Sequence, residues 1–419
     1  MERKYLIDTK ENIEFLEQMR EDLLDFGHMF PAPDGSSYYL ADDGTPWTDR
    51  PRETWITSRM VHVYSIGSIL GHKGSSELAE AGIRGLKDAL RDSENGGWYA
   101  GILPGADGSE YSPVPGKQCY AHAFVILAAS SALIAGIAGA RELLDDALYT
   151  YDRFFWDEEE GLARDMWNTE CDEYRGLNAN MHSVEAFLAA ADALEEDSYE
   201  VSEKYRERAG RIIDRVIGWA SESDWRIPEH FTEDWTPMPE YNREKPDDQF
   251  KPYGATPGHG IEWARLILQW AASTYEDGGE EYEKYLGASE NLFRRAAADA
   301  WDTDGAPGIV YTTDWEGKPV IHDRMHWTLA EAINTSAVLY RATGKSEYAG
   351  RYAEFMEYLD KCVLDKEKGS WFHQLSRSND PIDTVWPGKP DIYHAFQSTL
   401  IPYHDVSLSI AAAVKEECE

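Results

Sequence analysis

Apolar residues recur at helical spacing along almost the whole chain, whereas runs with the alternating pattern of a β-strand are few. Glycine follows the last periodic residue in several places, for example Gly71 after Leu70 and Gly344 after Thr343, as is typical of helix ends. The pattern predicts an all-α protein with helices near residues 10–26, 54–70, 77–92, 118–136, 140–154, 178–193, 201–220, 259–275, 280–301, 326–342, 347–363 and 393–413.

These predicted helices are of two alternating kinds. Counted from the N-terminus, the even-numbered helices carry small apolar residues, with His, Asn, Trp and Arg near their starts, while odd-numbered ones such as 201–220 have a charged and an apolar face. The first kind fits an inner ring and the second an outer ring. We therefore expect six helical hairpins that form an (α/α)6 barrel, a single domain over residues 1–419. No sequence identity between hairpins is visible, so the expected repeat is architectural.

Long breaks precede five of the expected inner helices, and they are rich in Gly, Pro, Asp and Trp. Long loops in compact domains are usually functional. If all of them lie at one end of the barrel, they form a cleft whose floor is the N-termini of the inner helices, which expose free N–H groups and a partial positive charge. The breaks are residues 27–53, 93–117, 155–177, 221–258 and 302–325.

The stretch ATPGHGIEW, at residues 255–263, carries the clearest chemical signal. A turn at Pro257 and Gly258 precedes a helix, so that His259 lies in its first turn and Glu262 follows three residues later. Residues three apart share a helix face. We therefore expect Glu262 to orient His259 and to stabilise its charged form.

A second stretch, DIYH, repeats this spacing with Asp391 and His394 after a turn rich in proline and glycine. Imidazole accepts and donates protons near neutral pH, which suits it to general acid/base catalysis. Two histidines with carboxylate neighbours thus predict a catalytic acid/base pair, His259 and His394.

Other expected inner helices also begin with polar and aromatic residues. In NANMHSVEAF, the side chains of Asn178, His182 and Glu185 lie on neighbouring turns of one face, which suits the binding of sugar hydroxyls. A network that only satisfies buried polar atoms is the alternative. Arg59 could bind hydroxyls or form an ion pair with Glu53 or another acid. Further candidates in these first turns are Trp55, Tyr120, His122, Trp327 and Glu331.

No cofactor is expected. The sequence contains histidines and carboxylates that could together bind a metal, but no stretch has a metal-specific spacing such as HExxH. A GxSxG elbow, a Walker loop and a GxGxxG turn after a strand are also absent from the sequence. The residues from which a metal site could be assembled are His182, His259, His394, Glu185 and Glu262.

The net charge of −37, from 77 acidic and 40 basic residues, is spread along the chain. Because phosphate groups would be repelled, it argues against nucleic acids and anionic membranes as partners. A solvated acidic surface fits a protein that stays soluble in high salt, so we expect a halophilic source. The alternative is an ordinary acidic cytosolic protein.

Cysteine usage and hydropathy indicate a cytoplasmic protein. The N-terminus lacks the apolar core of a signal peptide, and no CxxC pair occurs, so reduced thiols are expected. Residues 123–140 are uncharged but rich in Ala, Gly and Ser, which favours a buried helix over a membrane span. The four cysteines are Cys119, Cys171, Cys362 and Cys418.

The chain resembles the N-acylglucosamine 2-epimerase superfamily, in particular its aldose–ketose isomerase branch of mannose isomerases and sulfoquinovose isomerases. The resemblance runs nearly end to end. It implies an (α/α)6 barrel without metal or nucleotide, the acid/base pair His259 and His394 with Glu262 beside it, and a pocket that binds a monosaccharide. The stretches that carry it are WITSRMVHVYSIG, GGWYA, EYRGLNANMHSVEAFL, TPGHGIEWARL, GIVYTTDWEGKPV and DIYH. The implied pocket residues are Trp55, Arg59, Asn178, His182 and Glu331.

Two departures from this branch concern the substrate. The sulfoquinovose enzymes hold the sulfonate with an Arg shortly before the GTPGH-like stretch and with a Gln after a paired-aromatic motif. Gln249 and His373 stand at those places here, although Lys251 could compensate for the Arg. The resemblance therefore implies a neutral hexose, and we expect interconversion of D-mannose and D-fructose, with D-lyxose and D-xylulose as a further pair, through a cis-enediol.

Other functions stay open at this point. Within the same fold, the protein could be a sulfoquinovose isomerase or a sugar 2-epimerase. A glycoside hydrolase or lyase would need two carboxylates that flank a glycosidic bond, for which Glu262 and Glu331 are the candidates. A carbohydrate-binding protein without turnover is disfavoured, because binding alone does not need paired imidazoles. The sequence does not decide between a monomer and a homo-oligomer.

Overall fold

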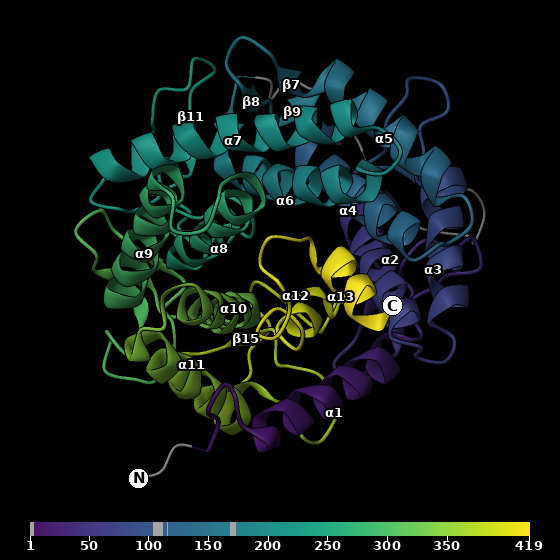
Figure 1. Cartoon of the computed structure of the whole chain (residues 1–419). Helices are drawn as coiled ribbons and strands as arrows, with labels where there is room; N and C mark the ends of the chain where they lie inside the picture. Colours follow the sequence, from purple (N-terminus) through teal and green to yellow (C-terminus); the bar gives the residue numbers. More distant parts are fainter. Residues whose placement is uncertain (1–3, 104–111, 115, 168–172) are drawn as a thin grey trace.

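Helices without a polar face alternate along the chain with helices that have one, and the fold separates them into two concentric rings (Figure 1). The computed structural model describes residues 4–103, 112–114, 116–167 and 173–419. The helices of this part are α1 (Lys10–Gly27), α2 (Thr54–Ile69), α3 (Ser75–Arg84), α4 (Cys119–Ile134), α5 (Ala140–Phe154), α6 (Leu177–Leu194), α7 (Tyr199–Glu222), α8 (Pro257–Thr274), α9 (Glu280–Ala300), α10 (His326–Thr343), α11 (Ser346–Tyr358), α12 (Tyr393–Gln397) and α13 (Ile410–Cys418). Single π-helical turns, Gly85–Ala89 and Leu359–Val363, extend α3 and α11.

The inner ring consists of α2, α4, α6, α8, α10 and α12, and each of these helices contacts the next around the ring. Each inner helix from α2 to α10 packs against the outer helix that follows it in sequence, and α1 closes the ring against α2 and α12. Helix α4 is buried over almost its whole length because its side chains are small and apolar, while α5 and α7 bury one face only. The predicted all-α (α/α)6 barrel is therefore confirmed.

Short strands join the long loops at the end of the barrel where the inner helices begin. The strand before each of α2, α4, α6 and α10 pairs, antiparallel, with a segment of the loop that leads to the next inner helix. Before α8, an isolated bridge between Ala255 and Thr313 does the same. As predicted, the long loops thus gather over the N-termini of the inner helices.

The strands of the described residues are short. They are β1 (Tyr39–Leu40), β2 (Pro46–Trp47), β3 (Arg52–Glu53), β4 (Gly101–Leu103), β5 (Ser112–Pro113), β6 (Lys117–Gln118), β7 (Trp156–Asp157), β8 (Leu162–Ala163), β9 (Met166–Trp167), β10 (Arg175–Gly176), β11 (His230–Phe231), β12 (Thr312–Thr313), β13 (Pro319–Ile321), β14 (Arg324–Met325) and β15 (Gln374–Leu375).

The predicted last helix, residues 393–413, is wrong. Helix α12 ends at Gln397, and turns lead from there to α13 at Ile410. Pro402 lies in this connection, where its missing N–H and its ring oppose a continuous helix. Because of this break, α13 packs against α2, α4 and α6. It lies near the later turns of the inner helices, away from the long loops at their N-termini.

A sequence repeat that the helical pattern does not reveal marks the ends of three outer helices. In each case, an aspartate carboxylate accepts hydrogen bonds from the backbone N–H groups two and three residues later. A glycine four residues after the aspartate adopts a positive φ. The repeat is D-x-x-x-G, so the hairpins do share a short motif, contrary to our expectation. The pairs are Asp92 and Gly96, Asp157 and Gly161, and Asp365 and Gly369.

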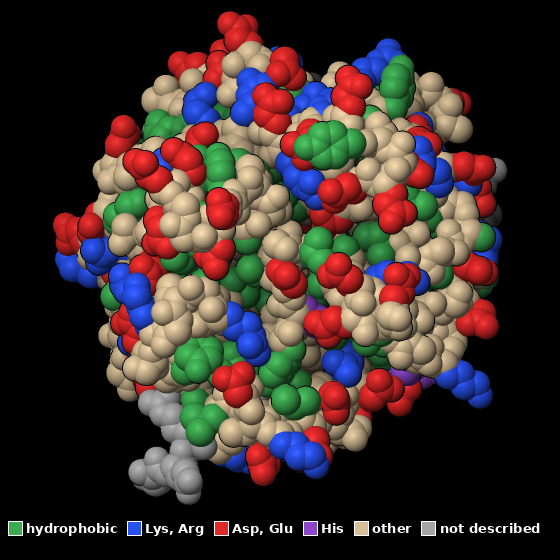
Figure 2. Space-filling view, in the orientation of Figure 1, with side chains coloured by type: hydrophobic (Ala, Val, Ile, Leu, Met, Phe, Trp, Pro, Cys, Tyr) green, Lys and Arg blue, Asp and Glu red, His purple; other side chains and the backbone are tan. Residues whose placement is uncertain are grey.

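Within the described residues, no helix has both the length and the hydropathy to cross a membrane. The uncharged stretch from residue 123 lies mostly in the buried helix α4, as expected. Acidic side chains are scattered over the face shown in Figure 2 among lysines and arginines, and they form no single patch there. Cys119 is a buried free thiol, Cys362 is half-buried and Cys418 is exposed, while Cys171 lies outside the described residues.

Candidate active site

A cavity lies where the inner helices begin, below the long loops. Polar groups from all six inner helices converge on it, and aromatic rings from the loops cover it. The lining residues are Arg59, Tyr120, Asn178, His182, Gln249, Phe250, Pro252, His259, Glu262, Tyr311, His326, Trp327, Trp386 and His394.

The two histidines of the expected acid/base pair both line this cavity. His259 is the third residue of α8, which begins at Pro257, and His394 is the second residue of α12. The ring centres of His259 and His394 lie 5.0 and 6.0 Å from that of Trp327. Only glycine fits before His259, because a Cβ on Gly258 would come within 2.7 Å of the Trp327 ring. Both imidazoles can therefore reach one molecule of monosaccharide size.

Each of these two histidines has its own carboxylate partner. The His394 Nδ1 atom lies 3.1 Å from Glu331 Oε1, and the His259 Nδ1 atom lies 2.9 Å from Glu229 Oε1. A carboxylate accepts only, so Nδ1 carries the proton in both rings and the Nε2 lone pair is free. Our expectation that Glu262 orients His259 is wrong, because the His259 ring turns toward the loop that carries Glu229.

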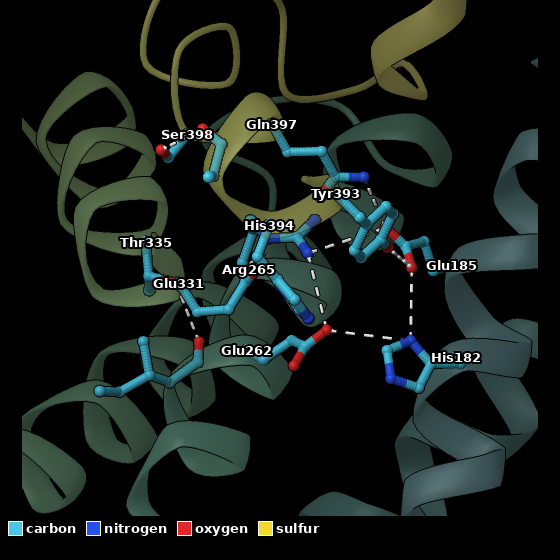
Figure 3. Close-up of polar contacts among 12 residues, drawn as sticks. His182, Glu185, Glu262, Arg265, Glu331, Thr335, Tyr393, His394, Gln397 and Ser398 are labelled. Carbon is cyan, nitrogen blue, oxygen red and sulfur yellow. Dashed lines mark hydrogen bonds and ion pairs between the residues drawn. The ribbon is translucent and has the colours of Figure 1, made fainter. Parts of the chain in front are cut away.

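Glu262 instead belongs to a cluster of buried acids around Arg265. The Arg265 Nε atom lies 2.9 Å from Glu331 Oε2, and its Nη2 atom lies 3.9 Å from Glu185 Oε1 and 4.0 Å from Glu262 Oε1. Figure 3 shows these side chains together with His182 and Tyr393, both of which contact Glu185. One guanidinium thus faces three carboxylates.

The acids of this cluster differ in protonation. Burial, together with the charge of Glu331, raises the pKa of Glu262 well above its usual value. Burial also acts to raise the pKa of Glu185, but hydrogen bonding to His182 and the charge of Arg265 outweigh it and hold this pKa below the usual value. The Tyr393 hydroxyl also donates to Glu185. Glu262 can therefore act as a neutral acid at the cavity wall, while Glu185 stays ionised.

Burial keeps several imidazoles neutral. The pKa of His394 lies well below 6.5 because of burial and the nearby charge of Arg59. Burial likewise lowers the pKa of His182 to about 4 and that of His326 to about 4. A neutral imidazole with a free Nε2 lone pair can accept a proton, as a general base must.

Arg59 and its aromatic neighbours form the wall beside α12. Its guanidinium donates to Asp391 at 3.2 Å and to the Tyr120 hydroxyl at 3.0 Å. It also stacks on the Trp55 ring, 4.8 Å from the ring centre. Arg59 therefore has the ion pair that we considered, with Asp391 as the acid and not Glu53. Trp55 itself lies behind the lining residues, with its ring centre 6.3 Å from that of Phe250.

Three residues expected in the pocket lie elsewhere. His122 accepts from the Trp98 backbone N–H at 3.0 Å, because it is two residues from Tyr120 and so projects from the far side of α4. The ammonium of Lys251 lies 3.6 Å from the centre of the Tyr174 ring, outside the cavity. His373 stacks behind His326 and does not line the cavity.

The other expected pocket residues come together. Asn178, His182, Glu262 and Trp327 line the cavity, and Glu185 and Glu331 lie directly behind it through their contacts with His182 and His394. The Asn178 Oδ1 atom is buried and has no protein partner, so it is available to a hydroxyl donor.

Sequence reasoning missed residues that loops contribute. Glu229 precedes β11, Phe250 and Trp386 lie on two different long loops, and Tyr311 precedes β12. The signal that could have found some of them is the abundance of aromatic residues in these loops. Nothing local marks Glu229, since its partner His259 lies 30 residues away.

Known proteins are similar to this chain over most of its length. The model of the N-acylglucosamine 2-epimerase (GlcNAc 2-epimerase) family matches residues 35–398. A D-mannose isomerase of Pseudomonas cannabina pv. alisalensis is 42% identical over 380 residues, which cover 90% of this chain and 89% of the relative. A D-mannose isomerase of Thermobifida fusca is 40% identical over 397 residues, 94% of each chain. A crystal structure of a D-mannose isomerase matches with a TM-score of 0.84 and 27% identity, over 94% of this chain and 98% of that one.

Proposed function

Because the chain belongs to the N-acylglucosamine 2-epimerase family, we propose that it is an aldose–ketose isomerase that interconverts D-mannose and D-fructose, with D-lyxose and D-xylulose as a further pair. The observation that carries this proposal is the pair His259 and His394. Both imidazoles line the same cavity, and the Nδ1 atom of each lies against a carboxylate. The two relatives at 40–42% identity, both named D-mannose isomerase, support the choice of sugar.

The proposed reaction begins with the open-chain aldose in the cavity. The free Nε2 of His394 removes the proton from carbon 2, which gives a cis-enediol, and returns it to carbon 1. Burial keeps His394 neutral, as this step requires. Positioned acid/base groups of this kind typically supply ~10²–10⁴-fold each.

The second histidine and Glu262 serve the oxygen atoms. His259 assists ring opening and moves protons between the two oxygens of the enediol, and Glu229 stabilises its charged form through the 2.9 Å contact. Glu262, a neutral acid at the cavity wall, can donate a hydrogen bond to the carbonyl oxygen of the open chain. Arg59, Asn178 and His182 then hold the remaining hydroxyls.

The test is a panel of mannose, lyxose, glucose, N-acetylglucosamine and sulfoquinovose, followed by NMR in deuterated water. An isomerase yields the ketose as the main product. A 2-epimerase, the alternative within the family, yields the other aldose. Mannose that stays unchanged while another sugar of the panel reacts would overturn the proposed substrate.

Two alternatives receive less support. A sulfonate needs a cation in the cavity. Arg59 is the one cationic side chain among the described lining residues, and it is paired with Asp391. Lys251 lies on the Tyr174 ring, outside the cavity. A glycosidase needs two carboxylates that reach the bond, but Glu331 is fully buried between Arg265 and His394. Both observations favour a neutral monosaccharide.

We further infer a single catalytic domain that works without metal or other cofactor. The donor atoms of His182, Glu185 and Glu262 lie close enough for a metal ion. Arg265, at 3.9–4.0 Å from both acids, already supplies a positive charge there. The charge of −37 and the reduced cysteines support a cytoplasmic, halophilic protein that does not bind nucleic acid. Whether it forms a homo-oligomer is a question for light scattering.

A further inference from the structure

His326 is a cavity residue whose outer nitrogen has no partner in the protein. It is the first residue of α10 and lies beside His394, with ring centres 6.2 Å apart. Its Nε2 atom is buried and forms no hydrogen bond, although the residue lines the cavity. A buried polar atom that stays unpaired costs free energy, so a partner from the ligand is expected at this position.

The partner of the other ring nitrogen, Nδ1, decides whether Nε2 donates or accepts a hydrogen bond. The His326 Nδ1 atom lies 3.4 Å from the His373 carbonyl oxygen, which can only accept. Nδ1 therefore carries the hydrogen and Nε2 the lone pair. The N-terminus of α10 and burial both disfavour a second proton on this ring. Nε2 is thus a hydrogen-bond acceptor and not a donor.

His373 holds this ring in place from behind. The two imidazoles stack with ring centres 3.6 Å apart and planes inclined by 20°. The register of β14 and β15 sets this contact, because Met325 pairs with Gln374 and the His326 backbone N–H donates to the His373 carbonyl at 3.1 Å. The neighbouring strand residues therefore bring both rings together.

On the basis of the proposed function, we propose that His326 Nε2 accepts a hydrogen bond from one sugar hydroxyl outside the reacting carbons, and that His373 positions His326 for it. Carbons 1 and 2 must lie between His394 and His259, so a third ring beside His394 meets a hydroxyl on carbon 3, 4, 5 or 6 of the open chain. His326 is then a specificity-determining residue, and it selects sugars that present a donor at that position.

The test compares mannose with its 3-deoxy, 4-deoxy, 5-deoxy and 6-deoxy analogues in the wild type and in His326→Leu. In the wild type, one analogue should lose about 10–100-fold in kcat/KM relative to mannose, because its hydroxyl is missing. In His326→Leu, mannose should lose a similar factor, and the preference for mannose over that one analogue should fall to within about threefold. His326→Gln, whose amide oxygen can take the place of Nε2, should restore part of the preference.

If the preferences for mannose over all four analogues are the same in the wild type and in His326→Leu, the inference is overturned. Thermal unfolding and far-UV circular dichroism of both variants show whether they are folded, and His326→Gln keeps the test valid if His326→Leu is not. A wild type that does not isomerise mannose at all would overturn the proposed function instead, so the two failures are distinguishable.

The positioning role of His373 has its own readout. His373→Phe keeps a flat ring behind His326 and should preserve the preference against the deoxy analogue within about threefold. His373→Ala removes the stack and should weaken that preference at least threefold, with kcat on the deoxy analogue nearly unchanged. An unchanged preference in a folded His373→Ala protein would refute this role.

Discussion

The two histidine–carboxylate pairs of the cavity look alike but differ in their electrostatic surroundings. Glu331 shares its charge between His394 and Arg265, with contacts of 3.1 and 2.9 Å. Glu229 contacts His259 at 2.9 Å, and no described Lys or Arg forms an ion pair with it. Both carboxylates fix the same tautomer, but only Glu229 offers an undivided negative charge to a protonated imidazole.

This difference indicates a division of labour. His394 lies near the positive charges of Arg59 and Arg265, and these charges disfavour its protonated form. It is therefore stable as a neutral base. His259 instead lies against Glu229, a carboxylate that no described Lys or Arg shares. We therefore assign the carbon proton to His394 and the oxygen protons to His259, as the proposed mechanism has them.

Removal of either histidine should have the largest effect. We expect His394→Asn and His259→Asn to lower kcat by about 10²–10⁴-fold, because each loses a positioned acid/base group. Steady-state kinetics with mannose measures the loss. His394→Asn should also abolish deuterium incorporation at carbon 2 of mannose in deuterated water, since that exchange needs the carbon base.

The matched control is His28→Ala, an exposed histidine after α1 that should leave kcat unchanged. Activity of His394→Asn within tenfold of the wild type would contradict the assignment. Loss of carbon exchange in His259→Asn, with exchange retained in His394→Asn, would reverse the two roles.

Exchange of the two carboxylates for amides should have an intermediate effect. Glu229→Gln should lower kcat about 10–100-fold with little change in KM or in the unfolding temperature, because a charge-assisted hydrogen bond of about 1.5–3 kcal/mol is lost. Glu331→Gln should lower kcat as well, but it should also destabilise the fold, since Arg265 loses its 2.9 Å partner in the interior. Kinetics and thermal unfolding of both variants separate the two cases, and equal destabilisation would remove the difference between the pairs.

The sequence predicts the barrel well because helix period and the presence of a polar face are local properties. Eleven of the twelve predicted segments coincide with the helices α1–α11 to within a few residues. The failure at residues 393–413 has a local cause as well, since Pro402 interrupts the predicted helix. The resemblance to known isomerases then directs attention to the correct end of the barrel.

The site is predicted less completely, because it depends on which way each side chain turns. His122 and Tyr120 begin the same helix, but two positions on a helix point to nearly opposite sides, so only Tyr120 reaches the cavity. Glu229 and Phe250 lie on loops whose course follows from pairing with distant segments. No periodicity within the chain encodes such contacts, and only the three-dimensional structure reveals them.

The neutral state of the inner imidazoles predicts a loss of stability in acid. Burial lowers the pKa of His62, His182 and His326 to about 4 each, while the unfolded chain binds protons on them near pH 6.5. Between pH 6.5 and 4 the unfolded state thus binds more protons, so the free energy of unfolding falls as the pH falls. Asp165, whose pKa burial raises to about 6, offsets part of this change.

We expect the unfolding temperature to drop by roughly 3–5 °C from pH 7.5 to pH 5, for a net loss of a few kcal/mol. Differential scanning calorimetry across this range measures it. His62→Gln, which removes one of these buried imidazoles, should make the dependence on pH shallower. An unfolding temperature that rises toward pH 5 would show that the acids dominate.

Chelation should have the smallest effect, and it tests whether the acids near His394 and His182 need a cation other than arginine. The donor atoms of His182, Glu185 and Glu262 lie within 4.8 Å of one another. Arg265 lies 3.9–4.0 Å from both carboxylates and would repel a second cation there. Dialysis against EDTA should therefore change kcat/KM by less than about twofold, which corresponds to less than about 0.5 kcal/mol. Loss of activity that Mn²⁺ or Zn²⁺ restores would mean that a metal, and not Arg265, balances these acids during catalysis.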